Sequence, residues 1–366
     1  MDHAFDGPPY TIGIEEELMI VDAETLDLAN AIETLLEDAG EGDVKPELHE
    51  SVLEIATGAC ADVTEAGEQL RALRRDVREH AQGRQLGIGS SGTHPFARWE
   101  DQRIVARERY RELVDALRFV ARQELIFGMH VHVGLDDPDK AIHVADGLRL
   151  QLAPLLALSA NSPFWRGDRT GLHSTRTPIF RAFPRVGVPP RYGDWAGYER
   201  EIELMVRAGV MEDYTWLWYD VRPHPNFGTV EVRVCDSQTR VEHTIGLAAL
   251  VQALVRELAE GFVAGTALEE VPWQMLDENK WLAARHGLEG ELIDLPSTDR
   301  VAAAELVRRL LDRVRDHAQD LGSADALGAI EDLLERGNGA QRQLLVFEAN
   351  RDLHEVTREI VKATGA

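Results

Sequence analysis

Three short segments of this sequence carry charged or imidazole side chains at alternating positions among apolar residues. Side chains on a β-strand alternate between the two faces of a sheet, so residues two apart share a face. Carboxylates, imidazoles and a guanidinium on one face can hold a hard metal cation and phosphate oxygens. The pairs that share a face are Glu15 and Glu17 in residues 13–22, His130 and His132 in residues 128–134, and Glu231 and Arg233 in residues 229–236.

Each pair also has an explanation that needs no ligand. Glutamates can mark a charged edge strand, and an acid beside an arginine can form a surface ion pair. The residues from Leu18 to Val21, however, are apolar and indicate a buried strand. Ionised carboxylates beside a buried strand are costly unless they are paired or bind a metal. We therefore favour a ligand-binding face.

The residue types favour Mg²⁺ or Mn²⁺ as the cation. Cys60 and Cys235 are the only cysteines, too few for a disulfide framework or a zinc cluster. The two histidines lack the His-Glu-x-x-His spacing of a zinc-protease helix. Many carboxylates with few thiols suit a hard cation. The sequence has neither a Walker-type phosphate loop nor a Gly-x-Ser-x-Gly motif, so nothing in it points to a covalent protein nucleophile.

Length, charge and hydropathy narrow the class of protein. A chain of 366 residues with 44% hydrophobic content can form one large domain, and we expect residues 1–366 to be a single catalytic domain. The formal net charge of −25 argues against binding to nucleic acid or to an anionic membrane. No apolar run approaches the ~18 residues that span a membrane, and the first residues do not resemble a signal peptide. We expect a cytoplasmic protein.

Hydrophobic periodicity predicts an α+β fold that becomes helical from about residue 290. Residues 24–40 indicate a short helix or an irregular link, and residues 161–197, rich in proline and arginine and without periodicity, indicate a functional loop. The predicted strands are 10–22, the end of 44–57, 85–88, 128–134 and a hairpin of 216–222 with 228–235. The predicted helices are 64–82, 99–127, 139–158, 194–208, 240–265, 278–286, 299–320, 323–336 and 341–363.

A set of motifs in fixed order gives a family resemblance. The motifs are Gly-Ile-Glu-Glu-Glu-Leu at 13–18, Leu-Glu-Ile-Ala-Thr at 53–57, Gly-Thr-His-Pro-Phe at 92–96, Gly-Met-His-Val-His-Val-Gly at 128–134, Leu-Ser-Ala-Asn-Ser-Pro-Phe-Trp at 158–165, Trp-Tyr-Asp-Val-Arg-Pro at 218–223 and Glu-Asn-Lys-Trp at 278–281. Together they resemble the glutamate–cysteine ligase type 2 family, in its carboxylate–amine ligase branch. Several also resemble strands of glutamine synthetase.

The resemblance implies a glutamine synthetase-like antiparallel sheet that forms a funnel-shaped active site and is backed by helices. ATP would enter one end, the acid substrate the other, and Mg²⁺ or Mn²⁺ would lie between them. It implies metal ligands at Glu15, Glu17, Glu54, His130 and Glu231, ATP contacts at His132, Arg233 and Lys280, a catalytic role for Arg233, and substrate contacts at Arg176 and Glu50. The partners would be small molecules, and a homodimer stays open.

The activity that the resemblance implies is ATP-dependent amide-bond formation through an acyl phosphate, with weak glutamate–cysteine ligase activity that gives γ-glutamylcysteine. Two alternatives stay open at this point. One is an ATP-dependent ligase or kinase that acts on a different acid or amine. The other is a non-catalytic protein that binds a metal or a nucleotide.

Overall fold

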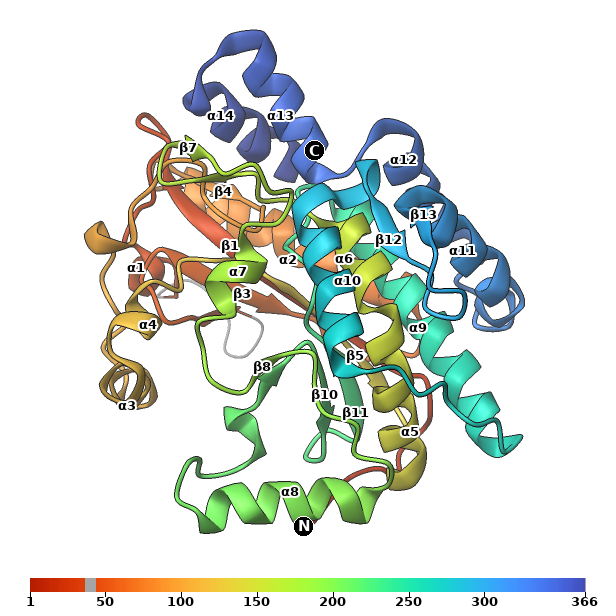
Figure 1. The fold of residues 1–366 in the computed structure, drawn as a ribbon. Helices are drawn as coiled ribbons and strands as arrows, with labels where there is room; N and C mark the ends of the chain where they lie inside the picture. Colours follow the sequence, from red (N-terminus) through yellow and green to blue (C-terminus); the bar gives the residue numbers. More distant parts are fainter. Residues whose placement is uncertain (37–43, 366) are drawn as a thin grey trace.

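A seven-stranded antiparallel sheet forms the centre of the molecule, and its longest strand is β1 (Ile12–Asp22). The computed structural model describes residues 1–36 and 44–365. The strands follow the order β10-β11-β5-β1-β3-β2, and β4 pairs with the end of β1 (Figure 1). The other strands are β2 (Val44–Pro46), β3 (Val52–Ala56), β4 (Leu86–Gly89), β5 (Met129–Gly134), β10 (Val221–His224) and β11 (Thr229–Val232). The predicted α+β class with an antiparallel sheet is therefore confirmed.

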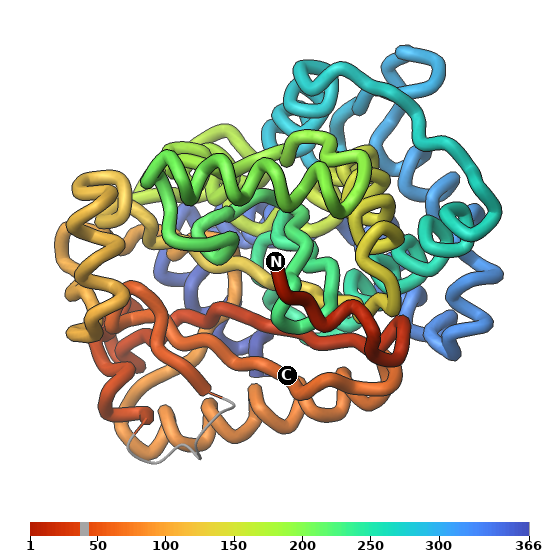
Figure 2. The backbone as a smooth tube through the Cα atoms, turned by 90° about the horizontal axis from the view of Figure 1, so that it is seen from below, coloured from red at the N-terminus to blue at the C-terminus, as the bar shows by residue number. Residues whose placement is uncertain are grey.

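One face of this sheet is apolar and packs against helices. Buried Ile14, Leu18, Val131 and Val232 alternate with the polar residues of their strands and lie in the main hydrophobic core. The covering helices are α2 (Val63–Gln82), α5 (Pro138–Leu148) and α9 (Val241–Val263). In Figure 2, α2 lies alongside β1 and β3. Burial of this face leaves the polar face available for chemistry.

Glu16 is the exception on the apolar face, and its charge is neutralised by Arg74 of α2. Arg74 donates from Nε and Nη2 to the two carboxylate oxygens at 2.8 and 2.7 Å, and the Thr244 hydroxyl of α9 donates to the same carboxylate. Both charged side chains are buried. A bidentate pair with further hydrogen bonds compensates for the cost of burying the charges. Glu16 is thus a structural acid, with its side chain opposite to those of Glu15 and Glu17.

Helices also cover one end of the polar face. Val356 and Ile360 of α14 pack against Met19 and Val21, the apolar end of β1 on that face. In Figure 1, α13 and α14 lie beside β4, and α3 and α4 lie at the opposite side. The remaining helices are α1 (Ile32–Leu36), α3 (Glu108–Leu117), α4 (Phe119–Arg122), α6 (Leu152–Ser159), α7 (Arg176–Phe180), α8 (Trp195–Arg207), α10 (Trp273–His286), α11 (Ala303–Asp320), α12 (Gly328–Arg336), α13 (Gly339–Asn350) and α14 (Leu353–Thr364).

Three helices predicted as continuous are interrupted. Residues 99–127 contain an extended stretch and then α3 and α4, which are separated by Arg118 at a φ of 55°. Residues 139–158 change to a 3₁₀ turn between α5 and α6, and residues 341–363 are divided by Arg351 at a φ of 54°. At Arg118 and Arg351 a residue in the left-handed region stops the i to i−4 hydrogen-bond ladder, although the apolar period continues across it.

Smaller differences concern the ends of the predicted elements. The predicted helix at 299–320 begins as the short strand β13 (Arg300–Ala302), which pairs with β12 (Glu291–Ile293). The predicted loop at 161–197 contains α7 and short strand pairs: β6 (Phe164–Trp165) with β7 (Asp168–Arg169), and β8 (Val186–Gly187) with β9 (Trp218–Tyr219). Of the predicted link at 24–40, α1 is observed, and residues 37–40 lie outside the described residues.

The segment Pro138–Ser159 is long and apolar enough to suit a membrane span by length and composition alone. In the described structure it comprises α5 and α6, and 83% of its most apolar window is buried inside the protein. It packs against α9 and α10. Core helices pass the same test of length and hydropathy, and this segment is such a helix pair.

Candidate active site

Pairing of the strands brings the predicted residues together on the polar face. Glu15 of β1 lies opposite His130 of β5, Glu17 lies opposite Glu54 of β3, and Glu231 of β11 lies opposite His132. Directly opposed residues on neighbouring strands place their side chains about 5 Å apart on the same face. The prediction that each pair shares a face is confirmed, and the sheet register assembles the pairs into one site.

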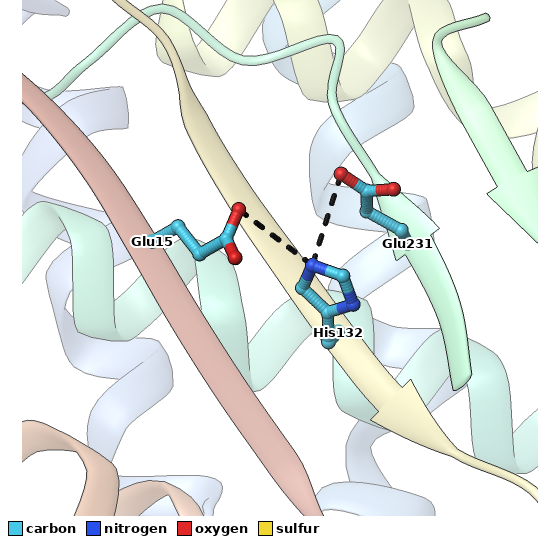
Figure 3. A group of neighbouring side chains, drawn as sticks. All are labelled: Glu15, His132 and Glu231. Carbon is cyan, nitrogen blue, oxygen red and sulfur yellow. Dashed lines mark ion pairs between the residues drawn. The ribbon is translucent and has the colours of Figure 1, made fainter. Parts of the chain in front are cut away.

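Glu15, His132 and Glu231 form the tightest potential metal-binding group (Figure 3). Their ligand atoms lie within 4.8 Å of one another, and His132 Nε2 is 3.7 Å from an oxygen of each carboxylate. The Thr229 hydroxyl lies 3.0 Å from His132 Nδ1, which fixes the ring with Nε2 toward the acids. A hydrogen bond to the other ring nitrogen commonly orients a histidine that binds a metal.

His130 adds a second imidazole to this group. Its Nδ1 lies 3.2 Å from Glu15 and 4.0 Å from Glu231. In the described part of the chain, Nε2 of His130 and Nε2 of His132 are buried without a hydrogen-bond partner. Buried nitrogens normally have partners, so the unpaired Nε2 of His132, which lies 3.7 Å from both Glu15 and Glu231, fits a bound cation. The family resemblance predicts a nucleotide contact for His132, and in the structure its ring also lies next to Glu15 and Glu231.

Two arginines hold Glu231 in its ionised form. Arg222 of β10 donates to Glu231 Oε2 at 2.7 Å, and Arg233 donates to Oε1. Burial alone would raise the pKa of Glu231, but Arg222 and Arg233 lower it well below the ordinary value. Burial would likewise raise the pKa of Glu15, and hydrogen bonds with His130 and His132 lower it instead. Both acids are therefore carboxylates at neutral pH.

A second group of acids, next to the first, behaves differently. Burial and the nearby Glu15 raise the pKa of Glu54 to about 7. Burial, followed by the nearby carboxylate of Glu54, raises the pKa of Glu47 well above the ordinary value. Burial, followed by the nearby carboxylate of Glu17, does the same to the pKa of Glu124. Acids that crowd together without enough cations hold protons. A divalent cation would relieve this repulsion, so these residues too fit a metal-binding environment.

A cavity of about 510 Å³ opens over these groups. Its polar lining includes Arg176, Arg222 and Arg233 together with Glu15, Glu17, His130, Glu47, Glu54 and Glu124. Its apolar lining includes Leu48, Val52, Leu113, Ile126, Phe180, Phe183, Trp216 and Trp218. Arg176, the first residue of α7, is buried at 4% exposure. Its Nε has no hydrogen-bond partner within the described residues, so it retains donors for a ligand in the cavity.

Four predicted site residues are not among the described residues that line this cavity: His132, Glu231, Glu50 and Lys280. His132 and Glu231 lie next to Glu15, which lines it, whereas Glu50 and Lys280 contact other parts of the protein. Glu50 accepts a hydrogen bond from Arg103 Nε at 2.7 Å. Lys280 of α10 is buried and donates to Asp220 Oδ2 at 2.5 Å. Both side chains are engaged with protein partners in this structure.

Three contributors to the site carried no clear signal in the sequence. Glu47 and Glu124 lie in irregular segments, after β2 and after α4, where no period marks a face. Arg222 belongs to the Trp-Tyr-Asp-Val-Arg-Pro motif, but its pairing with Glu231 depends on the β10–β11 register. A search for acids near the strand ends would have found Glu47, because the motif Leu-Glu-Ile-Ala-Thr follows it closely.

The comparisons with known proteins define the chain as an ATP-dependent ligase that is built on this antiparallel sheet. Its helices cover one face, and acids, imidazoles and arginines meet beneath a cavity on the other. The chain belongs to the Glutamate-cysteine ligase family 2 (GCS2), whose model matches residues 11–363. Members of this family form an amide bond, and so the predicted family and enzyme class are confirmed.

Curated relatives match nearly the whole chain. One, named "Putative glutamate–cysteine ligase 2", from Solibacter usitatus, is 40% identical over 361 residues, covering 98% of this chain and 94% of the relative. Another, "Putative glutamate–cysteine ligase 2-1" from Rubrobacter xylanophilus, is 42% identical over 364 residues, covering 97% and 95%.

Solved structures share the fold at low sequence identity. A glutamate–cysteine ligase of Francisella tularensis, solved in complex with AMP, superposes with a TM-score of 0.72 at 14% identity, covering 100% of this chain and 90% of that one. A bifunctional glutathione synthetase of Pasteurella multocida gives a TM-score of 0.69 at 14% identity, covering 98% of this chain and 51% of that one. These likenesses support the fold.

Proposed function

We propose that this protein joins the γ-carboxylate of glutamate to an amine, with cysteine as the first amine to test, and consumes ATP. The observation that carries the proposal is the convergence of Glu15, His132 and Glu231 with Arg233 on the sheet face beneath a cavity that also contains Arg176. The names of the relatives agree with these substrates. We further propose that the whole chain acts as one catalytic domain in the cytoplasm.

The chemistry requires activation of the acid. A carboxylate is a poor electrophile, because its leaving group would be oxide. Transfer of the γ-phosphoryl group of ATP to the acid gives an acyl phosphate, and the amine then displaces phosphate. Catalysis of such a transfer depends on positioning and on stabilising charge. This matches a site that offers fixed arginines and acids and that needs no protein nucleophile.

The proposed roles follow the placement of each side chain. Arg233 lies beside the potential metal-binding group and supplies a fixed positive charge for the phosphoryl oxygens. Arg176 supplies the cation that an acidic amino acid needs in its pocket. The acids Glu15, Glu17, Glu54 and Glu231 with His130 and His132 would hold Mg²⁺ or Mn²⁺, and Glu47 and Glu124 join them on geometric grounds. A bound divalent cation would neutralise charge on the phosphate oxygens.

ADP release measured over a panel of acids crossed with amines tests the proposal. A ligase releases ADP only when an acid and an amine are both present, whereas a kinase releases ADP with one acceptor. ADP release with glutamate alone at the full rate, or no turnover with any pair, would contradict the proposal. Mass analysis of the product identifies the amide, and sedimentation of the same sample determines whether the protein is a homodimer.

A further inference from the structure

Asp236 is a buried acid that lies outside the cavity and has no assigned role. It follows Arg233 by three residues and is fully buried. Three donors point at its carboxylate: the Asn161 amide and the Ser162 hydroxyl at Oδ2, at 2.8 and 2.7 Å, and the Ser174 hydroxyl at Oδ1, at 2.9 Å. A buried carboxylate that accepts several hydrogen bonds is a strong organising group.

The two serines connect Asp236 to the start of α7. Ser162 Oγ accepts from the Arg176 amide at 3.2 Å, and Ser174 Oγ accepts from the Thr177 amide at 3.4 Å. A hydroxyl has one hydrogen, so each serine that donates to Asp236 must present its lone pairs to α7. The residue that precedes the helix, Thr175, makes no side-chain cap. Asp236 thereby sets the direction of the hydroxyls that hold the first amides of α7.

The guanidinium of Arg176 is tied to the same stretch of chain. Nη2 donates to the Arg233 carbonyl at 3.2 Å and Nη1 donates to the Val234 carbonyl at 3.4 Å. The backbone amide of Arg176 is therefore held by Ser162, which in turn bonds Asp236. The guanidinium of Arg176 is held by the carbonyls of Arg233 and Val234, which precede Asp236 on the same segment. Both ends of the side chain take their positions from residues 233–236, and Arg233 itself reaches the metal-binding group.

Gly92 has no side chain, and the carboxylate of Asp236 and the hydroxyl of Ser162 occupy the space where its Cβ would lie. A Cβ on Gly92 would lie 2.6 Å from Asp236 Cγ and 2.9 Å from Ser162 Oγ. Any other residue at position 92 would displace the carboxylate or the serine. The Gly-Thr-His-Pro-Phe motif thus contributes its first residue to the packing around Asp236.

We propose that Asp236 is a positioning residue that fixes Arg176 at the angle needed to bind the acid substrate. The inference rests on the proposed role of Arg176 and adds to it the device that orients the guanidinium. Asp236 itself does not touch substrate. Its influence travels through Ser162 to the backbone amide of Arg176, and through Ser174 to the amide of Thr177 in the same first turn of α7.

The substitution Asp236→Asn tests the proposal. Its carboxamide offers one acceptor oxygen, so if that oxygen stays with Asn161 and Ser162, the NH₂ group faces Ser174. The Ser174 hydroxyl must then turn its hydrogen away from position 236, toward Thr177 Oγ1 at 3.0 Å, which disturbs its contact with the Thr177 amide. We expect KM for glutamate to rise about tenfold, the loss of roughly one hydrogen bond to a charged group, while KM for ATP stays unchanged. Ser90→Ala is the matched control, because this buried serine bonds Ser237 and does not touch Asp236.

A double-mutant cycle with Arg176→Ala separates this inference from the proposed function. If Asp236 acts through Arg176, Asp236→Asn has no further effect on KM for glutamate once Arg176 is removed. Full additivity would overturn the inference and leave the role of Arg176 intact. If Arg176→Ala itself leaves KM for glutamate unchanged, the role of Arg176 and the inference both fail.

Milder variants cover the case in which Asp236→Asn does not fold. Ser162→Ala and Ser174→Ala each remove one hydroxyl from the chain of contacts and leave the carboxylate with its other donors. Each should raise KM for glutamate and not KM for ATP. An equal rise in both constants, or a fall in kcat alone, would show that these residues support the fold in general and would overturn the inference.

Discussion

The substitution Gly128→Ala is expected to impair binding of the acid substrate without unfolding the protein. Gly128 lies just before β5, and its amide donates to Glu17 at 2.5 Å. A Cβ at this position would lie 2.3 Å from Nη2 of Arg176, whereas ordinary contact begins near 3.4 Å. The guanidinium must therefore retreat by about 1 Å. Because it is the end of a flexible side chain, it can move at small cost to the fold.

The size of the effect follows from that displacement. A misplacement of about 1 Å in a positioning group can cost on the order of a hundredfold in rate. Loss of a charge-assisted hydrogen bond alone, roughly 1.5–3 kcal/mol, would cost about ten- to a hundredfold. We therefore expect kcat/KM for glutamate to fall by about ten- to a hundredfold, while KM for ATP and the melting temperature change little.

Initial rates of ADP release, with glutamate varied at saturating ATP and amine, measure this effect. Gly58→Ala is the control, since the nearest atom to its new Cβ would be 3.6 Å away. An unchanged kcat/KM for glutamate in Gly128→Ala would refute the reasoning, because it would mean that the position of the Arg176 head does not matter to the acid. A large loss of melting temperature would show that the clash is not absorbed by the side chain.

Three further predictions concern charge and protonation. Arg233→Lys should lower kcat more than it weakens ATP binding, because an ammonium cannot hold two phosphoryl oxygens at once; turnover close to that of the unmodified protein would show that a simple positive charge suffices. Removal of divalent cations by a general chelator should abolish turnover, and added Mg²⁺ or Mn²⁺ should restore it; full activity in excess chelator would contradict the cation assignment. Burial lowers the pKa of His94 to about 4, so the unfolded chain binds the extra proton first as pH falls from about 6.5. Denaturant titrations should show that the free energy of unfolding falls between pH 6.5 and 4. In the His94→Gln variant this fall should be smaller by about 3 kcal/mol; an equal fall in the variant and the unmodified protein would assign the effect to other groups.

The sequence was sufficient to predict the strands that carry the site and the side chains that share a face. A strand imposes a period of two, and the apolar neighbours of Glu15, His130 and Glu231 made that period visible. The register that joins the strands was not visible, because it depends on pairing between segments about 100 residues apart. The family resemblance predicts a nucleotide contact for His132, and the register adds that its Nε2 lies 3.7 Å from both Glu15 and Glu231.

Residues outside regular elements were the hardest to place. Glu47 and Glu124 reach the cavity from loops, and a loop has no period that tells which way a side chain points. Lys280 was selected from a motif, but its position on α10 brings it to Asp220 and not to the cavity. The break at Arg118 was equally hidden, because one residue with a positive φ leaves the composition of the helix unchanged.

The three consecutive glutamates of β1 make its pairing register harder to specify while the protein folds. A strand of three identical acids cannot by itself distinguish the correct register from one shifted by a single residue, and such a shift moves every side chain to the other face. In the shifted register Glu16 would enter the site, Glu15 and Glu17 would compete for the single Arg74, and Ile14 and Leu18 would face the polar cavity. Arg74 pairs with one glutamate of the three, and together with the buried Ile14 and Leu18 it favours the register in which the other two face the site.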